Sequence, residues 1–107
     1  MVFYSQQANN DLDQILEGLL TWEKIVLTHE YCHNYVQAII SQCNRLDKTI
    51  YHARCTYQQH KQFGRYVHHF RKSKHTTWYI IYNKDKFNNI FIQHLVSNHL
   101  TSDENAE

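Results

Sequence analysis

Proline is absent from this sequence and glycine is scarce, so the composition enforces few tight turns. Gly18 and Gly64 are the only glycines among its 107 residues. No stretch approaches the roughly 18 consecutive apolar residues that a membrane-spanning helix needs. The opening segment, MVFYSQQANN, has neither a basic region nor an apolar core, so no secretory signal is expected. We therefore expect a cytoplasmic protein that does not associate with a membrane.

Cysteine is too rare and too irregularly spaced for a disulfide framework. The chain has three, Cys32, Cys43 and Cys55. An odd number without a recognisable spacing favours free thiols in a reducing compartment. On one helix, Cys32 and Cys43 would share a face but lie about 16 Å apart along the axis, too far to form a disulfide.

Apolar and aromatic side chains, in contrast, are plentiful enough for one buried core. Hydrophobic residues make up 42% of the chain and charged residues 20%, as in ordinary globular domains rather than in disordered chains. A chain of this length is expected to form a single domain. We assign residues 1–100 to that domain and residues 101–107 to a polar, acidic tail.

Charge is distributed unevenly along the chain. Residues 45–74 contain eight lysines and arginines and one acidic residue, a net charge of +7, although the whole chain carries only +1. Five of the nine histidines, His52, His60, His68, His69 and His75, lie in or beside this basic segment. Such asymmetry suggests a surface for a polyanion. The alternative is a solvated face with scattered basic residues.

Two amphipathic helices are predicted in the first half. After a short apolar strand at Val2–Tyr4, Ser5 can cap a helix whose apolar stripe recurs with helical spacing. A second helix is expected over residues 29–46, with Thr28 as its N-cap. The two stripes consist of Ala8, Leu12, Ile15, Leu16 and Leu19, and of Cys32, Tyr35, Val36, Ile39, Cys43 and Leu46.

The second half is rich in predicted strands. Residues 47–64 are polar and lack periodicity, which indicates a long basic loop with a short strand or turn near residues 50–52. Strands are expected over residues 65–71, 76–82 and 90–96, where β-branched and aromatic residues are dense. The order β-α-α-β-β-β predicts an α+β fold with a helical hairpin on one face of a mainly antiparallel four-stranded sheet.

One motif suggests metal chemistry. His29, Glu30 and His33 have the H-E-x-x-H spacing of zinc-dependent proteases, in which two imidazoles bind zinc and the glutamate activates water. The longer form of the motif fails, because Val36 and Ile39 stand at its glycine and final histidine positions. We interpret the match as chance in a histidine-rich chain and expect no metal or other cofactor. A zinc hydrolase is a minor alternative.

Four segments in this order resemble the RelE/ParE superfamily of bacterial toxins from toxin–antitoxin pairs. They are VFYSQQANNDLDQIL, GRYVHHFRKS, TTWYIIY and NNIFIQHLVSNH. The resemblance implies a compact toxin that a cognate antitoxin neutralises. RelE-like members cut messenger RNA on the ribosome, whereas ParE-like members inhibit DNA gyrase. The resemblance leaves both targets open, and an inactive scaffold as well.

For ribosome-dependent cleavage, the resemblance implies a site lined by the last three strands. Cleavage by the RNA 2′-OH needs proton-transfer groups and cations for the phosphorane charge, which histidine and arginine supply. The candidate catalytic residues are His69, Arg71, His94 and His99, and the candidate RNA-binding residues are Arg65, Lys72, Lys74, His75 and Tyr79. Tyr79 and His94 stand where many members carry arginine, which argues against strong nuclease activity.

Overall fold

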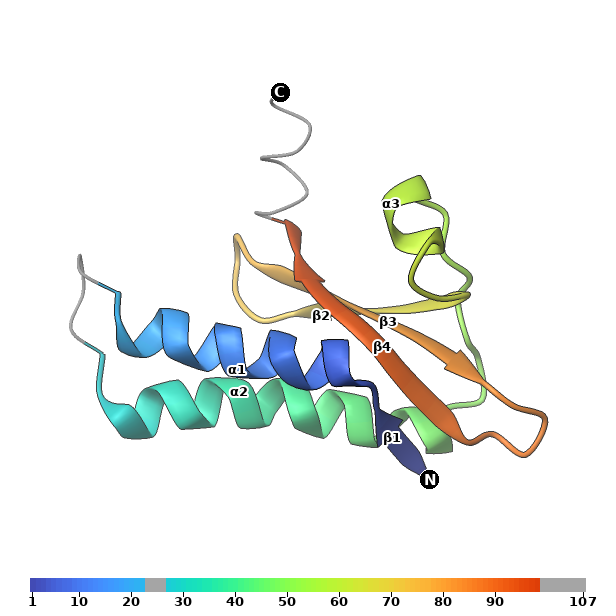
Figure 1. Cartoon of the computed structure of the whole chain (residues 1–107), viewed down its shortest axis with the longest axis horizontal. Helices are drawn as coiled ribbons and strands as arrows, with labels where there is room; N and C mark the ends of the chain where they lie inside the picture. The colour runs from blue at the N-terminus through green and yellow to red at the C-terminus, as the bar shows by residue number, and fades with distance from the viewer. Residues whose placement is uncertain (23–26, 99–107) are drawn as a thin grey trace.

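A computed structural model of the chain describes residues 1–22 and 27–98 (Figure 1). The chain has an α+β fold with a four-stranded sheet. In chain order, its elements are β1 (Val2–Tyr4), α1 (Gln6–Leu20), α2 (His29–Asn44), the 3-10 helix η1 (Leu46–Lys48), α3 (Gln58–Lys61), β2 (Tyr66–Arg71), β3 (Thr77–Lys84) and β4 (Ile90–Ser97).

The sheet is mixed, with strand order β1-β4-β3-β2. β3 pairs antiparallel with both β2 and β4, while β1 runs parallel to β4. All four expected strands are therefore present. The sheet is antiparallel except for the pairing of β1 with β4. A register shift opposite Ile81 and Tyr82 marks an irregularity in β4.

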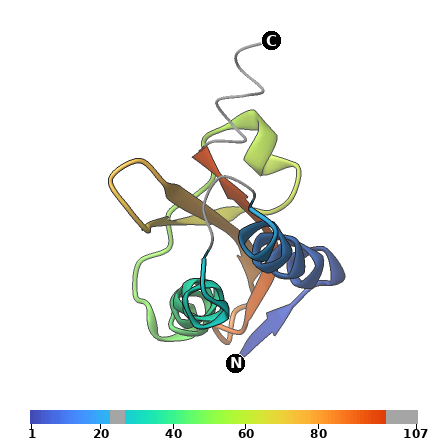
Figure 2. The ribbon, with the colours of Figure 1, turned by 90° about the vertical axis from the view of Figure 1, so that its left-hand side faces the viewer.

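The two long helices cover one face of the sheet, as expected (Figure 2). Both predicted N-caps are present. The Ser5 hydroxyl oxygen accepts a hydrogen bond from the backbone N–H of Ala8 and the Thr28 hydroxyl oxygen accepts one from Tyr31, each at 3.0 Å. The predicted stripes supply the helical part of the core, whose sheet part consists of Trp78, Ile80, Tyr82, Ile90, Ile92 and Leu95.

The opposite face is covered in part by the segment 49–65, which is more ordered than its composition predicts. It contains α3 and an isolated bridge between Arg54 and Tyr66, and no strand forms at residues 50–52. The segment was expected to be irregular because residues 47–64 are polar and lack periodicity; α3, at four residues and without a side-chain N-cap, is too short to produce a helical pattern. It is held instead by a second small core, in which Cys55, Val67 and Ile81 are buried.

Three further expectations concern the cysteines, membrane-spanning helices and the C-terminal tail. Cys32, Cys43 and Cys55 are all buried free thiols. No helix within residues 1–22 and 27–98 is both long and apolar enough to cross a membrane. The polar tail at residues 101–107 lies outside the described residues.

The two glycines give opposite expectations for substitution by alanine. A Cβ at Gly64 would lie 2.9 Å from Ile81 Cγ2 and 3.1 Å from the Tyr82 carbonyl oxygen. We expect Gly64→Ala to lower the free energy of unfolding by about 1–3 kcal/mol through this overpacking. Gly18 lies in α1 with nothing within 4 Å, so Gly18→Ala should raise it by about 0.5–1 kcal/mol. Urea denaturation measures both, and a shift of the two variants in the same direction would contradict the packing at Gly64.

His68 should make the stability depend on pH. Burial lowers its pKa from the ordinary value of 6.5, with smaller contributions from His69 and Arg45, and its Nε2 lies 3.0 Å from the Gln42 side-chain oxygen. The unfolded chain therefore binds a proton at this histidine more readily than the folded chain does. Stability should fall as pH decreases through 6.5, and His68→Gln should reduce that fall. Urea denaturation at pH 7.5 and pH 5 tests this, with exposed His33→Gln as the control. Equal pH dependence in both variants would exclude His68 as the cause.

Candidate functional site

β2 presents His69 and Arg71 on the sheet face that points away from α1 and α2. In the register with β3, His69 lies opposite Tyr79 and Arg71 opposite Thr77. Both His69 and Arg71 are exposed. Their neighbours Tyr66 and Phe70 instead pack against the helical core. The alternation expected from the sequence is thus confirmed.

The imidazole of His69 is held in a cluster of four rings, which we call the aromatic cluster: Tyr57, His60, His69 and Tyr79. The ring centroids of His69 and Tyr79 are 4.9 Å apart, with the planes at 89°. The ring centroid of His60 lies 4.9 Å from that of Tyr79, and that of Tyr57 lies 6.5 Å from it. Tyr57 remains half exposed, so the cluster offers a ring on which a nucleic-acid base can stack.

The basic residues at the turn between β2 and β3 point to opposite sides of the sheet. The Arg71 guanidinium donates a hydrogen bond to the carbonyl oxygen of Lys74 at 3.3 Å, and Lys74 and His75 are exposed beside it. Lys72 points to the opposite side, where its ammonium lies 4.7 Å from the ring centroid of Tyr35 on α2. Of the predicted RNA-binding residues, Lys74, His75 and Tyr79 therefore lie near Arg71, and Lys72 does not.

His94 is not brought together with His69. Tyr79 lies between His69 and Val96 in the register, so His94 is two strands and two residues from His69, a separation of about 12 Å. Its ring packs against that of Phe63, with centroids 4.1 Å apart and the planes tilted at 43°. His99 lies outside the described residues. A catalytic role for either residue stays a prediction.

Asp11 is the residue that sequence reasoning missed. Its Oδ2 accepts hydrogen bonds from His94 Nδ1 at 2.6 Å and from the Leu95 backbone N–H at 2.9 Å, and its Oδ1 accepts one from Gln7 at 2.8 Å. The carboxylate therefore fixes both the ring orientation of His94 and the irregular part of β4. Asp11 lies three residues after Ala8 on the apolar stripe, and this placement was a signal that it would be buried.

The remaining predicted residues lie apart from this face. Arg65 precedes β2, at the opposite end of the strand from Arg71. The H-E-x-x-H residues His29, Glu30 and His33 are exposed at the start of α2. Within the described part of the chain, no three histidine, cysteine, aspartate or glutamate side chains are grouped closely enough to hold a metal ion.

The chain has no match among protein-family models, curated proteins or solved structures. What the site can do therefore follows from its chemistry. An exposed imidazole, a guanidinium and neighbouring aromatic rings on one strand face can bind a phosphate next to a base and move a proton there.

Replacing Asp11 should destabilise the fold. Asp11→Asn leaves one neutral acceptor oxygen. If that oxygen takes the Oδ2 position, it bonds His94 and Leu95 more weakly and the new NH₂ group faces the Gln7 amide donor; in the other orientation, both His94 Nδ1 and the Leu95 backbone N–H lose their acceptor. We expect the free energy of unfolding to fall by about 1–3 kcal/mol. Asp13→Asn is the matched control, because Asp13 lies on the same helix and is exposed. Equal unfolding midpoints for the two variants in urea would show that the Asp11 contacts contribute nothing.

Proposed function

We propose that this protein is a RelE/ParE-type toxin that binds RNA with the open face of its sheet and cleaves ribosome-bound messenger RNA. The observation that carries the proposal is the exposed pair His69 and Arg71, adjacent on one face of β2. The order of the long elements, β1-α1-α2-β2-β3-β4, supports it as well, since the resemblance implies this order.

The chemistry assigns a different role to each residue. His69 takes the proton from the RNA 2′-OH, and the 2′-oxygen attacks the adjacent phosphorus while the bond from phosphorus to the 5′-oxygen breaks. The leaving 5′-oxygen takes a proton from the imidazolium or from water, so the products are a 2′,3′-cyclic phosphate and a 5′-hydroxyl. Arg71 stabilises the charge that develops on the phosphate oxygens, with two N–H groups directed at them. Lys74 and His75 on the turn attract the phosphate backbone, and Tyr57 stacks on a base. His94, which bonds to Asp11 and lies two strands away from His69, is assigned no step in this proposal.

A cognate antitoxin would be the protein partner. The C-terminal end of α1 and the N-terminal end of α2 are the helix ends farthest from β1 (Figure 1), and large apolar side chains are exposed there. Trp22 is 47% exposed and Tyr31 is 49% exposed. Both line one groove with Leu19, Leu27 and Tyr35. An antitoxin segment that covers this groove would remove apolar surface from water.

A protein target such as DNA gyrase is the second candidate, and one observation favours it. His94 is committed to Asp11 and Phe63, so it is not beside Arg71 as a second proton-transfer group. A site without the proton-transfer group expected from the closing strand is better suited to binding than to concerted acid–base cleavage. On this alternative, the same basic face would contact an acidic surface of the target protein.

Substitutions at the His69–Arg71 pair test the nuclease proposal. Expression of the wild-type chain in bacteria should slow growth and cut ribosome-bound message. Arg71→Ala should lower the cleavage rate about 10²-fold or more, because one preorganised transition-state donor is lost. His69→Ala should lower it about 10²- to 10⁴-fold. Primer extension on ribosome-bound messenger RNA measures cleavage, and growth curves measure toxicity.

Two controls match the substitutions in residue type. His33→Ala removes an exposed histidine from α2, and Lys86→Ala removes an exposed cation from the β3–β4 turn; both should retain full toxicity and cleavage. Toxicity without any message cleavage, unchanged in Arg71→Ala, would refute the nuclease and favour the gyrase-type target. A loss of cleavage in His94→Ala as large as that in His69→Ala would place His94 in the site.

A further inference from the structure

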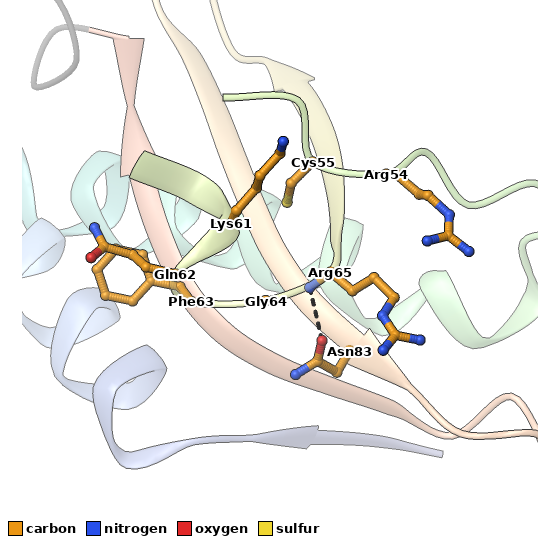
Figure 3. A pocket seen from close by; sticks show the side chains of 8 residues that line it. All are labelled: Arg54, Cys55, Lys61, Gln62, Phe63, Gly64, Arg65 and Asn83. Carbon is orange, nitrogen blue, oxygen red and sulfur yellow. Dashed lines mark hydrogen bonds between the residues drawn. The ribbon is translucent and has the colours of Figure 1, made fainter. Parts of the chain in front are cut away.

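A basic pocket lies at the end of β2 opposite to Arg71. It forms between the segment 54–65 and the end of β3 that carries Asn83, and has a volume of about 500 Å³. Its polar lining comprises Arg54, Lys61, Gln62, Arg65 and Asn83 (Figure 3). This volume lies within the roughly 300–1,000 Å³ typical of small-ligand sites. None of these residues belongs to the His69–Arg71 pair or to the aromatic cluster.

The pocket is positively charged without internal compensation. No carboxylate lines it. Among residues 1–22 and 27–98, ion pairs join Asp47 to the Met1 amine and Asp11 to His94, and none involves Arg54, Lys61 or Arg65. Three cations that share one concave surface repel each other, and an anion bound among them would relieve that repulsion.

Backbone contacts hold the two arginines in place. The backbone N–H of Cys55 donates to the carbonyl oxygen of Arg65 at 2.9 Å, and Arg54 forms a bridge with Tyr66. The backbone N–H of Arg65 donates to Asn83 Oδ1 at 2.8 Å. Figure 3 shows the side chains of Arg54 and Arg65 extending to the same side.

Asn83 adds a neutral donor to the pocket. Since its Oδ1 accepts from Arg65, its amide Nδ2 is left to donate to a ligand. The polar lining therefore offers guanidinium, ammonium and amide N–H donors, beside one amide oxygen from Gln62. Phosphate oxygens accept such groups, and guanidinium matches them in bidentate geometry.

We propose that this pocket binds a phosphate group of a nucleotide or of a nucleic-acid strand. The proposal does not depend on the nuclease, because the pocket shares no residue with the His69–Arg71 pair. The distance along β2 from Arg65 to Arg71 is six residues, about 20 Å of strand. A nucleic-acid strand of several nucleotides would therefore be needed to reach both sites, whereas a mononucleotide would occupy the pocket alone.

Titrations of the ¹⁵N-labelled full chain test the pocket directly. The probes are inorganic phosphate, adenosine 5′-monophosphate and a twelve-nucleotide RNA. We expect the backbone amide signals of Gly64 and Arg65 and the side-chain amide of Asn83 to shift on addition of phosphate-bearing probes. Tighter binding of the mononucleotide than of RNA would identify a nucleotide site, and the reverse would identify a strand-binding site.

A double variant, Arg54→Gln with Arg65→Gln, should weaken binding of the preferred probe about 10-fold or more. For RNA, it should also reduce the slope of log affinity against log salt by about 1.4, since each phosphate contact to a single strand contributes about 0.7. Arg45→Gln, an exposed arginine beyond the C-terminus of α2, is the control and should bind as the wild type does. The amide spectrum of each variant reports directly whether it is folded.

Two results would overturn the proposal. One is the absence of shifts at Gly64, Arg65 and Asn83 with all three probes at millimolar concentration. The other is a folded double variant with wild-type affinity and salt slope. Message cleavage separates this proposal from the nuclease, since His69→Ala should lower cleavage about 10²- to 10⁴-fold and leave phosphate binding at the pocket unchanged.

Discussion

The burial of β3 on both of its faces is the constraint on which the rest of the structure depends. Ile80 and Tyr82 face the helices and Ile81 faces the opposite side, and each is at most 1% exposed. Burial of each large apolar side chain contributes about 1.5–3 kcal/mol. A strand of this kind needs a partner on each edge and a cover on each face. β2 and β4 provide the edges, α1 and α2 cover one face, and the segment 49–65 covers part of the other.

That second cover divides the open face into two regions with different chemistry. Cys55 packs over Val67 and Ile81 and fills the middle of the face with apolar contacts. On one side of this small core lies the aromatic cluster with Arg71, and on the other lies the basic pocket with Arg65. The charge of residues 45–74 is therefore spread over separate surfaces rather than concentrated in one site. The segment that carries much of that charge is also the one that separates the two regions.

Local signals in the sequence predicted the helices and strands. The arrangement of the candidate site residues depends instead on contacts between residues that are far apart in the sequence. Ser5 and Thr28 cap helices through hydrogen bonds to residues three positions ahead, so their role was visible locally. The alternation in β2 likewise placed His69 and Arg71 on one face. The contact between Asp11 and His94 joins residues 83 positions apart, and no local pattern encodes it. The ammonium of Lys72 likewise packs on the ring of Tyr35 in α2, a residue far from it in the sequence.

Two of the buried thiols, Cys43 and Cys55, lie in separate cores, so their reactivity can report which part of the fold opens. Cys43 is in the core between helix and sheet, where burial raises its pKa to about 12. Cys55 belongs to the segment 49–65 and packs against the sheet, where burial also raises its pKa. A thiol reagent reacts with thiolate, so both cysteines are protected while the fold is closed. Since local openings differ in free energy, labelling of Cys55 before Cys43 would record release of the segment over the sheet as an event separate from unfolding of the core.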